Sequence, residues 1–223
     1  YDYNDLLKRH VLSATLDIVE AKPDYDWDWQ MVTSQSSFVP SSKFIYDHLD
    51  DNLNWDVLSH QDNQKLWGDE NLISTLAKES SISNEVDWKY VSSLKYFPLT
   101  ESVLKNVPIN ELNWKLISGR KTVIPLLNDY VDNIDWRIVS QNKHFMVGNV
   151  ELLGQYKDRL DWGIICRREE FKFSNEILEL YTEYIDWDLA SSSIDIDFSK
   201  AFVERFKDKW NWPVLVKNKA FHN

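Results

Sequence analysis

A tryptophan preceded by Asp or Asn recurs eight times in this 223-residue chain, on average about every 26 residues. An apolar residue lies two positions before each of these tryptophans, and another lies three positions after it. The next residue is Ser in five copies and Thr, Cys or Val in the others. A fixed period of this length is the signature of a tandem-repeat protein. The repeated tryptophans are Trp29, Trp55, Trp88, Trp114, Trp136, Trp162, Trp187 and Trp212.

Each copy of this motif has the features of a helix start. Asp and Asn are preferred N-cap residues, because the side-chain oxygen accepts a free backbone N–H of the first turn. The two flanking apolar residues then stand at the positions of a hydrophobic staple, which fixes how the chain enters the helix. The small residue lets another element approach closely, and a Ser there can bond the carbonyl one turn earlier. The motif therefore predicts eight helices that begin at tryptophan.

A second helix is predicted in each repeat. Apolar residues recur ten, nine, six and two positions before the next tryptophan, as in Leu152, Leu153, Tyr156 and Leu160 before Trp162. These spacings describe one face of an α-helix. Start signals precede several of these segments, at Ser41–Ser42, Asp69, Thr100 with Glu101, Ser174 and Asp197. We therefore expect a short helix led by tryptophan, a turn, and then a longer amphipathic helix.

The predicted fold class is all-α. Two such helices cannot bury their apolar faces alone, whereas stacked neighbours can, which predicts a right- or left-handed α-solenoid. We expect about seven full repeats plus partial terminal repeats, forming a single repeat domain over residues 1–223. Residues 5–21 fit the tail of a preceding repeat or a cap. Because the last repeat stops soon after Trp212 and the first residue is Tyr1, we expect the natural protein to continue beyond this chain.

The arrangement resembles α-helical tandem-repeat proteins such as the TPR and HEAT classes. The repeat of about 26 residues is shorter than the repeats of those classes. The resemblance covers nearly the whole chain and is architectural: it implies a solenoid and no particular function.

Composition and motifs argue against several functions. The chain has 25 basic and 36 acidic residues, so it is not a general binder of phosphate backbones. A single cysteine excludes a disulfide framework, and no stretch has the length of apolar sequence that a membrane helix needs. Phosphate loops, nucleophile elbows and spaced His ligands are missing from the sequence. We expect a cytoplasmic protein with no enzymatic activity, catalytic residue, metal or cofactor.

The tryptophans allow two interpretations. A ring repeated once per unit can offer stacking platforms to bases, sugars or prolines. Alternatively, each ring fills the seam between repeats, with its indole N–H bonded to a neighbouring carbonyl or carboxylate, and this is the favoured interpretation. Trp67 lies outside the repeated column, in an extra segment near residues 61–68, and is predicted to be an exposed contact. Cys166 replaces Ser in the small-residue column and is predicted to be a buried thiol.

Charge is uneven along the chain. Residues 1–113 carry 9 basic and 19 acidic residues, which would favour a basic partner, whereas residues 114–170 carry 9 and 8. Some of these cations follow a repeat tryptophan directly, which suggests a basic stripe along one edge; a solvated edge balanced by carboxylates is the other interpretation. The candidate binding residues are Trp67, Arg120, Lys121, Arg137, Lys143, Arg167 and Arg168.

Two functions remain. The first is a non-catalytic scaffold that presents an extended surface to a protein or peptide partner. The alternative is a nucleic-acid-contacting repeat domain within a larger DNA- or RNA-processing or defence enzyme, which would use residues 115–168 for phosphates. The sequence indicates no oligomeric state.

Overall fold

The computed structural model describes residues 1–222, and within that range every regular element is helical. Internal contacts divide the chain into two compact parts, Tyr1–Ile117 and Ser118–Asn223. We call these the first part and the second part and describe each by itself. The expectation of one continuous repeat domain stays a prediction. Among the described residues, no helix is both long enough and apolar enough to cross a membrane.

All eight helices that the motif predicts are present, and each begins at its tryptophan. In each copy the preceding Asp or Asn side chain accepts the N–H of the third helical residue, as Asp161 accepts the Ile164 N–H at 3.1 Å. We number positions in each repeat from this tryptophan as position 0. The Trp-led helices are α3 (Trp29–Thr33), α5 (Trp55–Ser59), α9 (Trp88–Ser93), α11 (Trp114–Ile117), α12 (Trp136–Gln141), α14 (Trp162–Ile165), α16 (Trp187–Ser192) and α18 (Trp212–Leu215).

The second helices also form, and most are one to four residues longer than the Trp-led helix of the same repeat, as predicted. Only α7 reaches 9 residues, and α10 has 4. Ser41, Asp69, Thr100 and Ser174 cap them as predicted, whereas α17 is capped by Ser199 rather than Asp197. These helices are α2 (Leu16–Glu20), α4 (Ser42–Asp47), α7 (Glu70–Lys78), α10 (Glu101–Leu104), α13 (Val150–Tyr156), α15 (Asn175–Leu180) and α17 (Lys200–Arg205).

The second helix before Trp136 is a 3-10 helix, η2 (Lys121–Leu126). Pro125 lies inside it, and in an α-helix the proline ring would clash with the carbonyl four residues earlier, which disfavours the α-helical form here. The extra segment in the repeat of Trp55 forms a short helix of its own, α6 (Gln64–Trp67). The remaining elements are α1 (Tyr3–Lys8), α8 (Ser80–Ser83), η1 (Ile109–Glu111) and η3 (Lys219–His222).

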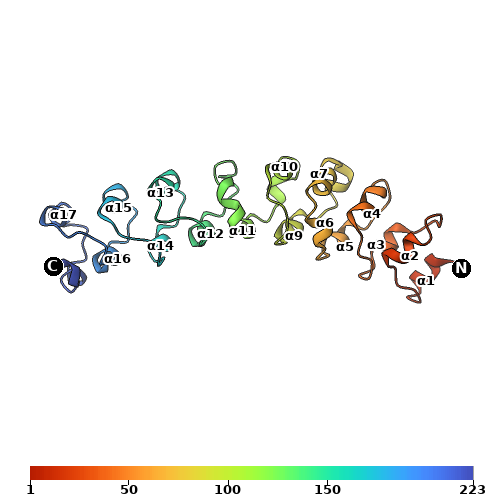
Figure 1. The fold of residues 1–223 in the computed structure, drawn as a ribbon, viewed down its shortest axis with the longest axis horizontal. Coiled ribbons are helices and arrows are strands. Elements are labelled where there is room, and N and C mark those ends of the chain that lie inside the picture. The colour runs from red at the N-terminus through yellow and green to blue at the C-terminus, as the bar shows by residue number, and fades with distance from the viewer. Residues whose placement is uncertain (223) are drawn as a thin grey trace. The chain divides into compact units, whose positions relative to one another are not determined.

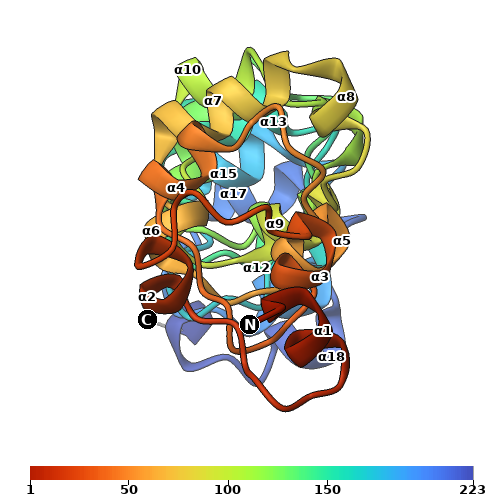
Figure 2. The ribbon, with the colours of Figure 1, turned by 90° about the vertical axis from the view of Figure 1, so that its right-hand side faces the viewer.

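Within each part the helices lie in two rows. In the second part, α12, α14 and α16 follow one side, and α13, α15 and α17 follow the other (Figure 1). The first part shows the same separation, with α4, α7 and α10 on the side opposite α3, α5 and α9 (Figures 1 and 2). The core lies between the rows: the apolar residue at position +3 is 0% exposed in all eight copies, and the one at position −2 is buried in all eight. The predicted staple residues are therefore core residues.

Most repeat tryptophans join two second helices. In six copies the indole N–H donates to the carbonyl five residues earlier, where the previous second helix has ended, as Trp162 does to Lys157 at 2.8 Å. The ring of Trp162 also lies 5.1 Å from that of Tyr181, the C-cap residue of its own second helix. Five of the eight tryptophans are buried, as the seam interpretation predicts.

Three repeat tryptophans are more exposed. Trp29 and Trp187 are half-buried, and Trp212 is 42% exposed. The prediction of a buried ring is wrong for Trp212, because no second helix follows it within residues 1–222 to cover the ring.

Position +4 links each repeat to the next. Its hydroxyl donates to a carbonyl one turn earlier, as Ser140 does to Trp136, and accepts the N–H of the next N-cap residue. Where Cys166 replaces Ser, its thiol sulfur accepts a hydrogen bond from the Asp186 N–H. This contact, which we call the junction bond, occurs at seven places. The six hydroxyl acceptors and their donors are Thr33 and Asn54, Ser59 and Asp87, Ser92 and Asn113, Ser118 and Asp135, Ser140 and Asp161, and Ser191 and Asn211.

Candidate functional site

An apolar column lies on the outer side of the Trp-led helices. Position +2 is apolar or aromatic in all eight copies, yet no copy is fully buried, and Leu116 is 52% exposed. The core is already supplied by positions 0 and +3, so packing alone does not explain this column. Repeated, partly exposed apolar side chains are typical of a surface that contacts another molecule. The column is Met31, Val57, Tyr90, Leu116, Ile138, Ile164, Leu189 and Val214.

Three pockets recur beside this column in the second part. Each is bordered by a +5 residue of one repeat and by the +2 residue of the next repeat. The Gly119 pocket includes Ile138 and has a volume of about 360 Å³. The Gly163 pocket includes Ile164 and measures about 500 Å³, and the Phe173 pocket includes Leu189 and measures about 390 Å³. The repeat therefore places equivalent pockets at successive junctions.

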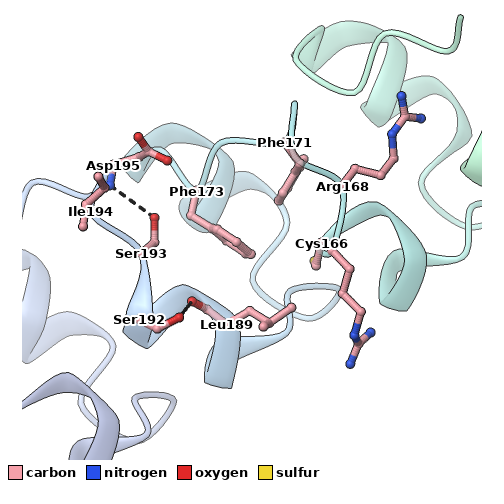
Figure 3. Close-up of a pocket in the computed structure, with 10 residues that line it drawn as sticks. Cys166, Arg168, Phe171, Phe173, Leu189, Ser192, Ser193, Ile194 and Asp195 are labelled. Atoms are coloured by element: carbon pink, nitrogen blue, oxygen red, sulfur yellow. Dashed lines mark hydrogen bonds between the residues drawn. The ribbon is translucent and has the colours of Figure 1, made fainter. Parts of the chain in front are cut away.

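The Phe173 pocket lies between α14 and α16 (Figure 3). Phe171 and Phe173 enter it from the loop that follows α14, and Leu189 enters it from α16. The two phenylalanine rings are 5.0 Å apart, edge to face. Asp195 at its border forms an ion pair with Lys172 at 3.7 Å, so its charge is balanced locally.

The Gly163 pocket has fixed charged groups at its edge. The Arg167 guanidinium donates to the Gly163 carbonyl and, at 3.2 Å, to the Asp186 carboxylate. The Asp161 carboxylate is held as the N-cap of α14. A Cβ atom at Gly163 would lie 3.3 Å from Asp161 Oδ1 and 3.4 Å from an Arg167 nitrogen. The missing side chain at position +1 therefore keeps the entrance to this pocket open.

The corresponding junction in the first part is filled. His60 occupies the +5 position that Gln141 holds beside Gly163. Its Nε2 atom lies 3.3 Å from the Asp87 carboxylate, and its ring lies 4.6 Å from that of Tyr90 at position +2. The side chain of His60 thus covers the two groups whose counterparts, Asp161 and Ile164, border the Gly163 pocket.

Arg168 belongs to the repeat junction rather than to a free basic stripe. It donates to the carbonyls of Ser140 at 3.2 Å and Asn142 at 3.0 Å, and its side chain is only 10% exposed. Figure 3 shows its guanidinium turned away from the Phe173 pocket. Asn142 and Asn218 hold the same +6 position and likewise donate to carbonyls of the preceding repeat. The interpretation of Arg168 as a free surface cation is therefore wrong.

The other predicted cations differ in exposure and in their position relative to the three pockets. Lys143 is exposed beside the Gly119 pocket, and Arg167, with 62% of its side chain exposed, borders two pockets. Lys121 and Arg137 are exposed but border none of the three pockets. Arg120 is half-buried, and this burial lowers its pKa. The structure thus brings Lys143 and Arg167 to the pocket-bearing face.

Trp67 is buried, not exposed. The ring is 0% exposed, and its indole N–H donates to the Leu58 carbonyl at 3.1 Å. The extra segment folds inward as α6, whose Leu66 is also 0% exposed. The prediction of an exposed contact at Trp67 is wrong, because the adjacent apolar pair belongs to the core.

Reactive groups are sparse in the described chain. Within residues 1–222 no three His, Cys, Asp or Glu side chains are grouped to hold a metal. Cys166 is 4% exposed, which confirms the predicted buried thiol, and this burial raises its pKa to about 11. A thiol with so high a pKa is a poor nucleophile near neutral pH.

The sequence interpretation missed the pocket residues Gln141, Gly163, Ile164 and Leu189. Their signal was nonetheless present: position +2 is apolar in every copy, and Gly163 is the only position +1 residue without a side chain. The chain was compared with protein-family models, curated proteins and solved structures, and none of them matches it.

Proposed function

We propose that this chain is a non-catalytic recognition scaffold whose repeats stack as an α-solenoid. The outer side of the Trp-led helices in the second part then binds a protein or peptide. The observation that carries this proposal is the recurrence of pockets beside Ile138, Ile164 and Leu189 at successive junctions. Repeat scaffolds vary such surface residues while the buried columns maintain the fold. Each pocket combines an apolar +2 residue with polar and charged groups, which suits the recognition of peptide side chains.

Local charge favours a peptide over a nucleic acid. Among the cations of residues 115–168, Arg159 pairs with Asp132 at 3.1 Å and Arg168 is held inside a junction. A phosphate backbone needs several unpaired cations along one track.

Selection from a random peptide display library tests the proposal. We expect the chain to enrich a related set of peptides that lose binding to Ile164→Glu, which places a charge on the outer column. Leu180→Glu is the matched control, because Leu180 is an exposed apolar residue on α15, in the other row. Thermal unfolding checks that both variants are folded. No enrichment, or enrichment that both variants lose equally, contradicts the proposal. Tight binding of labelled DNA or RNA at low salt would instead favour the nucleic-acid alternative.

A further inference from the structure

We infer that the pocket face binds an acidic, extended peptide of a partner protein in the polyproline II conformation, with the Gly163 pocket taking an apolar anchor side chain. This inference rests on the proposed function and specifies its ligand. It follows from the spacing of the pockets, from their charge and from the open entrance at Gly163.

The spacing of the pockets favours polyproline II. Packed helices lie about 8–10 Å apart, and α12 is packed against α14. The Gly119 pocket borders α12 and the Gly163 pocket borders α14, so we take these two pockets to be separated by about that distance. A polyproline II helix advances about 3.1 Å per residue with three residues per turn, which puts every third side chain on one face about 9 Å apart. A β-strand places same-face side chains about 6.6 Å apart, too short for this step.

Peptides in this conformation carry unpaired backbone carbonyls, because polyproline II has no internal hydrogen bonds. Gln141 is exposed at the border of both the Gly119 pocket and the Gly163 pocket. Its side-chain amide can donate to a carbonyl of a peptide that passes from one pocket to the other. This position fits a ligand that crosses the junction rather than one that enters a single pocket.

The charge of the face favours an acidic peptide. Arg167 uses two of its five N–H groups on Gly163 and Asp186, which leaves N–H groups for a ligand carboxylate. Lys143 is a second exposed cation, beside the Gly119 pocket. Asp195 pairs with Lys172, whereas Asp161 keeps its negative charge as the N-cap of α14, so we expect acidic residues of the peptide beside Arg167 and Lys143 rather than beside Asp161. In the proposed peptide, the acidic residues that face Arg167 and Lys143 therefore lie between the apolar anchor residues.

Gly163 makes its pocket the anchor. Every other repeat has a side chain at position +1, and the Gly163 pocket has the largest volume of the three. Gln141 makes no hydrogen bond to Asp161 across this junction, whereas His60 lies against Asp87 at the matching junction of the first part. The chain thus contains both an open and a closed form of one junction, and substitutions can convert the open form into the closed one.

The test uses a fluorescein-labelled peptide of four tandem Leu-Glu-Pro triplets, titrated with the whole chain and followed by fluorescence anisotropy. Gln141→His copies the closed junction, and Gly163→Met fills the entrance. We expect each to weaken binding by about tenfold or more, the usual effect of losing one apolar anchor. Lys89→Met is the matched control, because it places the same side chain at position +1 of a closed junction, and it should bind as the wild type does. Thermal unfolding shows whether each variant is folded.

Peptide controls separate the parts of the inference. Ser-Glu-Pro triplets remove the anchors, Leu-Lys-Pro triplets reverse the charge, and a peptide of the same composition with adjacent leucines removes the spacing; all three should bind at least about tenfold more weakly. If a control peptide binds as tightly as the Leu-Glu-Pro peptide, the feature that it lacks (apolar anchor, acidic charge or three-residue spacing) is not required and that part of the inference is wrong. Unchanged affinity in both junction variants would overturn the anchor assignment. If only display-selected peptides of another type bind, and Ile164→Glu abolishes that binding, this inference fails while the proposed function stands. If no peptide binds at all, both fail.

Discussion

The Oγ atom of Ser140 lies 2.9 Å from the backbone nitrogen of Asp161 and 2.7 Å from the carbonyl oxygen of Trp136. Ser140 therefore donates a hydrogen bond within one Trp-led helix and accepts one from the N-cap residue of the next Trp-led helix. The same pair of bonds, with Thr or Ser, is made at Thr33, Ser59 and Ser191. A single buried side chain thus satisfies two backbone groups that belong to different repeats.

We expect Ser140→Ala to destabilise the protein by about 1–3 kcal/mol, because the Asp161 N–H loses its partner in a buried place. Urea denaturation followed by far-UV circular dichroism measures this change. Ser192→Ala is the control: its hydroxyl also bonds a carbonyl, but it is exposed, and the expected change is within about 0.5 kcal/mol. Equal effects of the two substitutions would show that the junction bond contributes no more to stability than the exposed bond of Ser192.

The repeat tryptophans should differ in their contribution to stability according to their burial. Trp162 is 7% exposed and packs against Tyr181, so Trp162→Ala should cost about 3–5 kcal/mol. Trp212 is 42% exposed, so Trp212→Ala should cost clearly less. Chemical denaturation of both variants tests this ranking. A near-zero effect at Trp162 would remove the core role of the column and revive the stacking-platform interpretation.

A ladder of polar contacts connects the turns that follow successive second helices in the second part. The residue at position −4 of one repeat accepts a bond from the residue at position −3 of the next. These pairs are Asp132 with Arg159, Asp158 with Tyr184, and Glu183 with Lys209. In the first part, Asp51 and Glu85 hold the same two positions and border one cavity of about 290 Å³. Glu85 therefore stands where three junctions of the second part have a hydrogen-bond donor, and Asp51 contacts His48 instead, with Oδ2 2.7 Å from His48 Nδ1.

Glu85→Lys should therefore stabilise the protein by up to about 1 kcal/mol, because it puts a cation in place of an acidic residue at the cavity that Asp51 also borders. The gain should shrink at high salt, which screens such charges. Thermal unfolding at low and high ionic strength measures both effects. Glu85→Gln removes the acidic charge without adding a cation and should give a smaller gain. If the Lys variant is no more stable than the Gln variant at low salt, the ladder does not extend to this junction.

Cys166 should react slowly with thiol reagents in the folded protein. Burial raises its pKa to about 11, so the thiolate is scarce at pH 8 and modification should accelerate greatly in urea. The raised pKa also makes the folded state prefer the neutral thiol. The resulting stability is present below the ordinary thiol pKa and is lost as the pH rises towards 11.

Cys166→Ser supplies the control for this pH dependence, because Ser is the residue found at this position in five other copies. The wild type should lose more stability than the Ser variant between about pH 8.5 and pH 11. Denaturation of both proteins across that range gives the comparison. Parallel curves, or fast modification of the folded protein at pH 8, would contradict the buried neutral thiol.

The predictions from sequence succeeded where the contacts are local. An N-cap such as Asp161 and its partner Ile164 are three residues apart, so the spacing of residue types is enough to predict their bond. The position −2 and +3 columns follow from the same local geometry. The 3-10 helix before Trp136 escaped prediction because the apolar pattern was given more weight than Pro125.

Contacts between repeats were harder to predict. Asn142 and Arg168 both donate to backbone carbonyls more than 20 residues away, and such acceptors leave no mark in the sequence. Because different residue types perform this task at position +6, no repeated letter indicates it. The pocket at Gly163 escaped notice for a related reason: it depends on a missing side chain, which a search for reactive groups does not detect.

The junction bond also bears on how a chain of this kind changes in length. Each copy brings an acceptor at its trailing edge and a backbone donor at its leading edge, and these match the edges of every neighbour that has kept Ser or Thr at position +4. An in-frame duplication or loss of one period in the gene would therefore join edges that already fit. A change in the number of repeats therefore requires no new type of contact between them.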